Sequence, residues 1–180
     1  LHQQNSFLLN SLGKQVGSPL FTLLDEPHLI GANGARYFDG EGVATRPMPV
    51  FDAGMLRTYY IDTYCARKME VEPTIASPSL LVLAPGAQTQ EELIAEVTHG
   101  LFVTGFNGGN CNSSTGDFSY GIEGFLIEHG QLTQPVNEMV VTGNMIDLWQ
   151  HLAAVGNDAR MESNWRIPTL TFEGVTASGC

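Results

Sequence analysis

The sequence predicts an α+β domain: a strand-rich, mostly antiparallel sheet, curved or barrel-like, with two to three helices packed on it. Three observations favour this fold class. Two segments, residues 43–63 and 125–136, have the apolar pattern and the glycine turn of a β-hairpin. A capping-box sequence begins at Thr89. The length of 180 residues suffices for one core, so we expect a single domain over residues 1–180.

The first hairpin follows a short predicted helix. Residues 3–12 place apolar side chains at near-helical spacing and end at Gly13, which predicts the end of a helix. In the hairpin, Gly54 supplies the positive φ that its turn needs. Pro47 and Pro49 lie in the first arm and cannot donate to a ladder, so this arm is expected at a sheet edge or a bulge.

The middle of the chain is predicted to hold an irregular connection and then a helix. Residues 72–88 contain several prolines and little periodicity, which is typical of a surface connection. In the capping box, the Thr89 hydroxyl accepts from a backbone N–H and Glu92 reaches back. The helix is expected to run to His99, with Gly100 as its C′ residue and a strand from Leu101.

Residues 104–117 are dense in Gly, Asn and Ser and nearly free of aliphatic residues, which predicts a long loop. A long loop in a compact domain is more often functional than accidental, although a glycine-rich connection that only lets two backbones approach is an equal alternative. The candidate peptide-binding or interface residues are Gly108, Gly109, Asn110, Thr115, Gly116, Asp117, Phe118 and Ser119.

The remainder is predicted to contain the second hairpin, a helix and a last strand. The hairpin turns at residues 128–130, and Val140 and Val141 continue its sheet. Asn144 is expected to cap a helix that reaches Leu152. Residues 170–175 are expected to form the last strand.

The composition excludes several function classes. With 8 basic and 19 acidic residues the formal charge is −11, which argues against direct nucleic-acid binding. No apolar run approaches the roughly 18 residues of a membrane span, so no membrane contact is predicted. Three widely spaced cysteines without C-x-x-C indicate a reducing compartment. Leu1 in place of Met indicates a fragment.

No catalytic or metal site is predicted in this chain. Glu96 and His99 have E-x-x-H spacing, with Glu92 a turn earlier, but no second E-x-x-H exists to complete a metal site. Asp147 and His151 form a lone i,i+4 pair, which is more typical of a helix surface. No H-E-x-x-H, P-loop, G-x-G-x-x-G or G-x-S-x-G sequence occurs.

Ordered motifs along nearly the whole chain resemble the C-terminal domain of the TldD/PmbA family, a putative modulator of DNA gyrase, and specifically its TldE/PmbA branch. Residues 5–15 are similar to the branch's S-x-F-L-L-D-S-L-G-K-Q, and residues 26–29 to its D-P-H-L. Residues 38–43 and 65–68 are similar to F-D-x-E-G-V and S-A-R-K. Further matches, in the family's order, lie at residues 100–104, 115–119, 124–128, 135–136, 143–144 and 155–158.

The resemblance implies a cytoplasmic two-component metallopeptidase that cuts peptides in an enclosed chamber. TldD-type subunits hold zinc through an H-E-x-x-x-H helix and a Cys near the C-terminal end, whereas TldE-type subunits lack these ligands. Residues 158–167, where that Cys would fall, contain no sulfur ligand other than Met161, which is a poor one for zinc. We therefore expect no cofactor in this chain, and zinc in its partner.

Three functional hypotheses follow. The first is a TldE-like subunit without metal that binds an extended peptide by strand addition, with a TldD-type protease subunit or a second copy as its partner. The second is an active zinc metallopeptidase whose HExxxH helix precedes Leu1. The third is an acidic protein that regulates DNA gyrase by presenting acidic surface to a basic groove.

Overall fold

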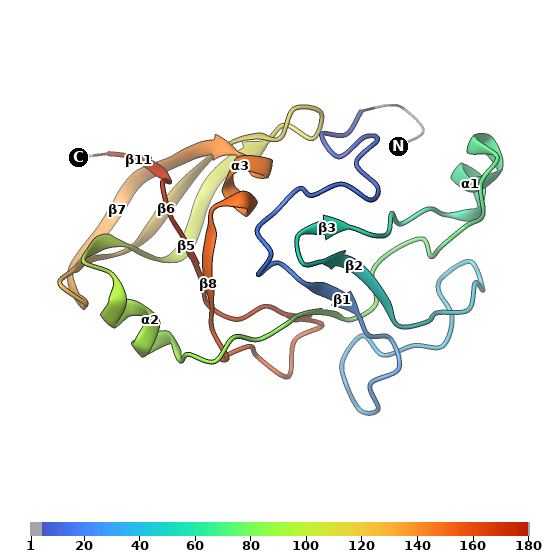
Figure 1. Cartoon of the computed structure of the whole chain (residues 1–180), viewed down its shortest axis with the longest axis horizontal. Helices are drawn as coiled ribbons and strands as arrows, with labels where there is room; N and C mark the ends of the chain where they lie inside the picture. The colour runs from blue at the N-terminus through green and yellow to red at the C-terminus, as the bar shows by residue number, and fades with distance from the viewer. Residues whose placement is uncertain (1–4, 180) are drawn as a thin grey trace.

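The computed structural model describes residues 5–179, which form an α+β fold with two main sheets. The five-stranded sheet has the order β3-β2-β1-β4-β9, and the four-stranded sheet the order β11-β7-β6-β5. The short β8 and β10 pair with each other, and Figure 1 shows β8 running between the two sheets. Among the described residues neither sheet closes into a barrel, and the predicted α+β fold class is confirmed.

The bounds of the elements are as follows. The five-stranded sheet contains β1 Leu23–Asp25, β2 Met48–Asp52, β3 Met55–Leu56, β4 Leu81–Leu83 and β9 Trp165–Arg166. The four-stranded sheet contains β5 His99–Cys111, β6 Asp117–Glu128, β7 Gln131–Asn144 and β11 Thr176–Ser178. The remaining elements are β8 Leu152–Val155, β10 Leu170–Phe172, α1 Thr63–Met69, α2 Gln90–Glu96 and α3 Met145–Gln150.

A cluster of buried apolar side chains joins the five-stranded sheet to the β8–β10 pair. Leu83 of β4 packs with Phe21 and with Leu152 and Val155 of β8. The ring of Trp149 in α3 stacks on Phe21 with centroids 4.1 Å apart. This packing fixes the two strand systems and α3 relative to one another.

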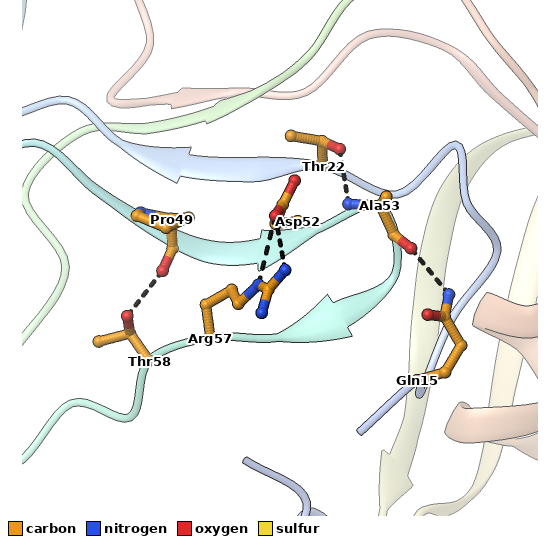
Figure 2. Close-up of polar contacts among 7 residues, drawn as sticks. All are labelled: Gln15, Thr22, Pro49, Asp52, Ala53, Arg57 and Thr58. Carbon is orange, nitrogen blue, oxygen red and sulfur yellow. Dashed lines mark hydrogen bonds and ion pairs between the residues drawn. The ribbon is translucent and has the colours of Figure 1, made fainter. Parts of the chain in front are cut away.

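The first predicted hairpin is confirmed as β2–β3. Its turn has positive φ at both central residues, Ala53 (47°) and Gly54 (78°), as right-twisted hairpins require. Figure 2 shows how side chains hold the turn: Gln15 Nε2 donates to the Ala53 carbonyl at 2.7 Å, and the Ala53 N–H donates to Thr22 Oγ1 at 3.0 Å. Arg57 of the same hairpin is paired with Asp52 at 3.0 Å.

Of the two prolines of the first arm, Pro47 precedes β2, and Pro49 lies at a bulge rather than at an edge. β2 is internal, between β3 and β1, and its register with β1 shifts at Leu23/Leu24, opposite Pro49. On the β3 side the chain leaves the ladder early, and Thr58 Oγ1 donates to the Pro49 carbonyl at 2.7 Å. The missing proline donor is therefore placed where the ladder is already irregular.

The helix predictions were correct in place but not in length. The Thr89–Glu92 capping box is present, yet α2 ends at Glu96 with Val97 in an extended conformation, so Gly100 is not its C′ residue and lies in β5. Asn144 caps α3, which ends at Gln150 because Leu152 begins β8. The short helix α1, capped by Asp62, was not predicted.

The short helix predicted at residues 3–12 was wrong where it can be compared. Residues 5–12 form turns, and residues 3 and 4 lie outside the described part of the chain. Long-range bonds hold the turns: the Phe7 N–H donates to the Ser113 carbonyl, and the Tyr59 hydroxyl donates to the Leu8 carbonyl. These contacts replace the hydrogen bonds of a helix.

Two other segments also differ from expectation. The predicted irregular connection of residues 72–88 contains β4, an internal strand of the five-stranded sheet. The strand expected at residues 170–175 ends at Phe172, and β11 follows it. Among residues 5–179, no helix is long and apolar enough to cross a membrane.

Candidate functional site

The candidate peptide-binding residues lie on the β5–β6 hairpin rather than on a long loop. β5 continues to Cys111, and only residues 112–116 connect it to β6. The loop prediction for residues 104–117 was therefore wrong. Gly108, Gly109 and Asn110 belong to β5, Thr115 and Gly116 to the connection, and Asp117, Phe118 and Ser119 to β6.

β5 forms one edge of the four-stranded sheet, as Figure 1 shows, and the short β11 forms the other. It has 13 residues, and residues 106–110 are all exposed. An edge strand presents N–H and C=O groups that no neighbouring strand uses. The glycine-rich composition is compatible with a strand here because a solvent-facing edge needs few apolar side chains.

Two irregularities interrupt the ladder between β5 and β6. Val103 pairs with Gly124 and Gly105 with Glu123, so Thr104 has no Cα partner in β6. Between the Phe106 and Gly109 pairings, Asn107 and Gly108 face the single residue Gly121. Bulges of this kind bend and twist an edge strand, and they often lie beside functional sites.

The two adjacent glycines of the second bulge have different roles. Gly109 has φ of +115°, and a Cβ there would lie 2.1 Å from the Ser119 carbonyl oxygen. Gly108 has φ of +127°, but a Cβ there would have no atom within 4 Å. Close approach of β5 and β6 therefore requires Gly109, whereas Gly108 faces open space.

The connection between β5 and β6 is held by its own polar groups. Asn144 Nδ2 donates to the Thr115 carbonyl at 2.9 Å and to Asp117 Oδ1 at 3.0 Å. Thr115 Oγ1 donates to Asp117 Oδ2 at 2.7 Å. These bonds, first that from Asn144 and then that from Thr115, hold the pKa of Asp117 below its usual value. Thr115 and Asp117 thus have a structural role in the hairpin.

Aromatic rings line one part of the hairpin. Phe118 is buried and Phe106 is 70% exposed, and Tyr120 contacts both, with ring centroids 5.9 Å and 5.6 Å away. Gly116 lies under Phe7, whose ring a Cβ would meet at 3.2 Å. Gly116 and Phe118 are buried, and the exposed members of the candidate set are Gly108, Gly109, Asn110, Thr115, Asp117 and Ser119, with Phe106 beside them.

The donor groups of the described residues do not fit a metal ion. No three His, Cys, Asp or Glu side chains of residues 5–179 come together in a way that could hold one. Glu96 Oε1 accepts from Gln88 Nε2 at 2.7 Å, and His151 Nδ1 lies 2.7 Å from the Asp147 carbonyl oxygen. One side chain of each spaced pair, Glu96 and His151, is thus used in a local hydrogen bond. Cys180 lies outside the described residues.

Three buried charged residues had no signal in the sequence. Asp25 accepts from the N–H groups of Ser79 and Leu80, and Asp39 from those of Glu41, Val43 and Ala76. Both carboxylates organise loops. Arg166, 9% exposed, differs because its Nε has no hydrogen-bond partner. A sequence pattern cannot reveal whether a buried charge is paired.

Comparison with known proteins finds a family that matches nearly the whole chain. Residues 1–179 match the PmbA/TldA metallopeptidase C-terminal domain. The metalloprotease PmbA of Escherichia coli O157:H7 is 33% identical over 99% of this chain and 40% of its own length. The metalloprotease PmbA homolog of Haemophilus influenzae is 31% identical, again over 99% of this chain and 40% of its own length.

Two solved structures are also similar to this chain over nearly its whole length. A Bacteroides thetaiotaomicron protein, proposed in its description to modulate DNA gyrase, is 62% identical with a TM-score of 0.98, over 99% of this chain and 41% of that one. TldE from Thermococcus kodakarensis, 24% identical over 99% of this chain and 46% of its own, shares the fold with a TM-score of 0.87.

The fold and these matches define a metallopeptidase C-terminal domain. The chain belongs to the PmbA/TldD family, and the resemblance found in its motifs is confirmed. It spans about 40% of the length of the curated relatives it matches.

Proposed function

We propose that this chain belongs to a TldE/PmbA-like subunit that holds no catalytic metal and supplies peptide-binding surface to a two-component cytoplasmic metallopeptidase. The zinc and the catalytic residues are contributed by a TldD-type partner. The substrates are small or unfolded peptides, which the assembly processes or degrades.

The open edge of β5 carries this proposal. An extended peptide adds to a sheet edge through backbone hydrogen bonds, and pockets beside alternate side chains give specificity. β5 offers a 13-residue edge on which residues 106–110 are exposed. Phe106, 70% exposed and held by Tyr120, supplies an apolar contact next to Gly108, where no side chain obstructs an approaching backbone.

The donor set supports the assignment of the metal to a partner. The side chains within residues 5–179 lack a cluster that could ligate zinc, which prefers three or four Cys, His or carboxylate ligands. Relatives such as PmbA of Escherichia coli O157:H7 are metalloproteases by name. Both observations fit a subunit whose contribution to the reaction is surface rather than metal.

The test uses the full-length protein, purified alone and then mixed with a TldD-type partner. We expect peptide cleavage only in the mixture, with the zinc measured by elemental analysis in the partner. Zinc and cleavage in the full-length protein alone would contradict the proposal and favour an HExxxH helix elsewhere in the parent chain. A sizing experiment on the protein alone distinguishes self-association from a need for the partner.

One further outcome separates a regulatory function from a proteolytic one. Solved relatives are described as proposed modulators of DNA gyrase, and this chain has a formal charge of −11. A regulator acting through acidic surface would inhibit gyrase with steep weakening by salt, and it would cleave no peptide in any pairing. That combination of results would favour the regulatory function and contradict the peptidase proposal.

A further inference from the structure

Arg166 is a buried cation for which the described residues provide no counter-charge. Its side chain is 9% exposed, its Nε is sealed from solvent without a hydrogen-bond partner, and it forms no ion pair within residues 5–179. Arg57, which follows β3 at the opposite edge of the five-stranded sheet, is paired with Asp52 at 3.0 Å. The chain has 19 acidic residues, so carboxylates are abundant, yet none is placed against Arg166.

An unpaired buried guanidinium is costly to a fold. Leaving a buried donor unsatisfied costs about 1–3 kcal/mol, and more for a charged group. An apolar side chain of similar volume would be neutral or stabilising in its place. The unsatisfied Nε of Arg166 therefore lowers the stability of the isolated domain, and an anionic ligand is one explanation for such a group in a native fold.

Arg166 lies at an edge of the five-stranded sheet. It lies in β9, an edge strand that pairs only with β4, in parallel, with Arg166 opposite Val82 and Trp165 opposite Leu81. Successive side chains of a strand point to opposite faces, so Trp165 and Arg166 flank this edge on its two sides. Trp165 is 59% exposed, and Ile167 packs on the buried apolar cluster and anchors the strand.

We infer that Arg166 is a binding residue for a carboxylate of a bound peptide, at the β9 edge of the five-stranded sheet. A guanidinium fork binds a carboxylate through two parallel hydrogen bonds, and burial strengthens the pair. The net charge of −11 favours a singly charged carboxylate over a polyanion such as phosphate. The occupant is a peptide only if the proposed function holds, so the inference rests on it.

The experiment measures peptide binding by calorimetry with the full-length protein, in complex with its partner where assembly requires it. Three probes are used: a short peptide with a free C-terminal carboxylate, its C-terminal amide, and the amide with one internal Glu. The variants are R166M, which removes the charge at similar volume, R166K, which keeps the charge without the fork, and R57M as the matched control.

We expect the free-carboxylate peptide to bind wild type and R57M at least about tenfold more tightly than the amide. In R166M the affinities for the free-carboxylate peptide and for its amide become equal. In R166K the preference for the free carboxylate is smaller than in wild type and larger than in R166M. Stronger binding of the Glu-containing amide than of the plain amide, lost in R166M, would assign the site to a side-chain carboxylate instead of a terminal one. The thermal unfolding midpoint of R166M should equal or exceed that of wild type.

Several results would contradict the inference, and they differ in what they say about the proposed function. Equal binding of all three peptides by wild type would overturn the inference while leaving peptide binding intact. An unchanged carboxylate preference in R166M would do the same, as would a lower unfolding midpoint, because Arg166 would then be satisfied within the protein. Binding of no peptide by wild type would overturn the proposed function, and the inference with it.

Discussion

Asn144 links the β5–β6 connection to α3 through both ends of its amide. Nδ2 donates to Asp117 Oδ1 at 3.0 Å, while Oδ1 accepts from the Ile146 N–H at 3.0 Å and caps the helix. N144A should lose about 2 kcal/mol of unfolding free energy, since it removes the cap and leaves Asp117 short of a donor. N144S retains a capping oxygen and should lose less. Urea unfolding measures both, and equal losses would refute the two-ended role.

Gly109 and Gly108 should respond differently to the same substitution. Both have positive φ, so alanine strains either backbone by about 1–2 kcal/mol. Only at Gly109 would the new Cβ also meet backbone, 2.1 Å from the Ser119 carbonyl oxygen. G109A should therefore lower the unfolding midpoint well beyond G108A. Similar midpoints for the two variants would show that the bulge relaxes easily.

Asp25 is expected to be the most sensitive of the buried polar residues. It is fully buried and accepts from the Ser79 and Leu80 N–H groups and from the Tyr60 hydroxyl at 3.1 Å. D25A leaves the two backbone donors without an acceptor and should lower the unfolding free energy by about 3 kcal/mol or more. Y60F removes one bond and should cost about 1 kcal/mol. Burial raises the pKa of Tyr60, so its hydroxyl remains the donor over the accessible pH range. A D25A variant as stable as Y60F would contradict this account.

Acidification should destabilise the fold in part through Asp39. The N–H of Ala76, followed by those of Val43 and Glu41, lowers the pKa of Asp39 below 3.8. A group with a lowered folded-state pKa contributes stability above its unfolded-state pKa, and this contribution disappears as the pH falls through the folded value. Urea midpoints at pH 7 and pH 3 should therefore differ less in D39N than in wild type. An identical pH dependence in D39N and wild type would argue against a contribution of ionised Asp39 to stability.

The sequence could predict elements whose signals are local. The Thr89–Glu92 capping box and the turn at Gly54 depend on side chains within a few residues, and both appear as expected. Strands of two or three residues, such as β9 and β11, carry no periodic signal and form only because β4 and β7 lie beside them. Their existence is a tertiary property.

The loop prediction behind the candidate site failed for a physical reason. The Gly-rich composition of residues 104–117 indicated a loop because strands usually show apolar alternation. β5 is an edge strand whose order comes from its ladder with β6 and whose exposed positions need no apolar residue. The unpaired state of Arg166 depends on the three-dimensional placement of every carboxylate, which no single sequence reveals.

Blocking the β5 edge at Thr104 tests the central claim most directly. Thr104 lies at a bulge without a Cα partner in β6, so proline is tolerated there better than elsewhere in the strand. Proline lacks the backbone N–H, and on an edge strand it hinders pairing with a further strand. T104V keeps that N–H and is the matched control. In the full-length assembly, T104P should weaken peptide binding about tenfold or more at an unchanged unfolding midpoint, while T104V binds as wild type does. Equal peptide binding by T104P, T104V and wild type would contradict strand addition at β5.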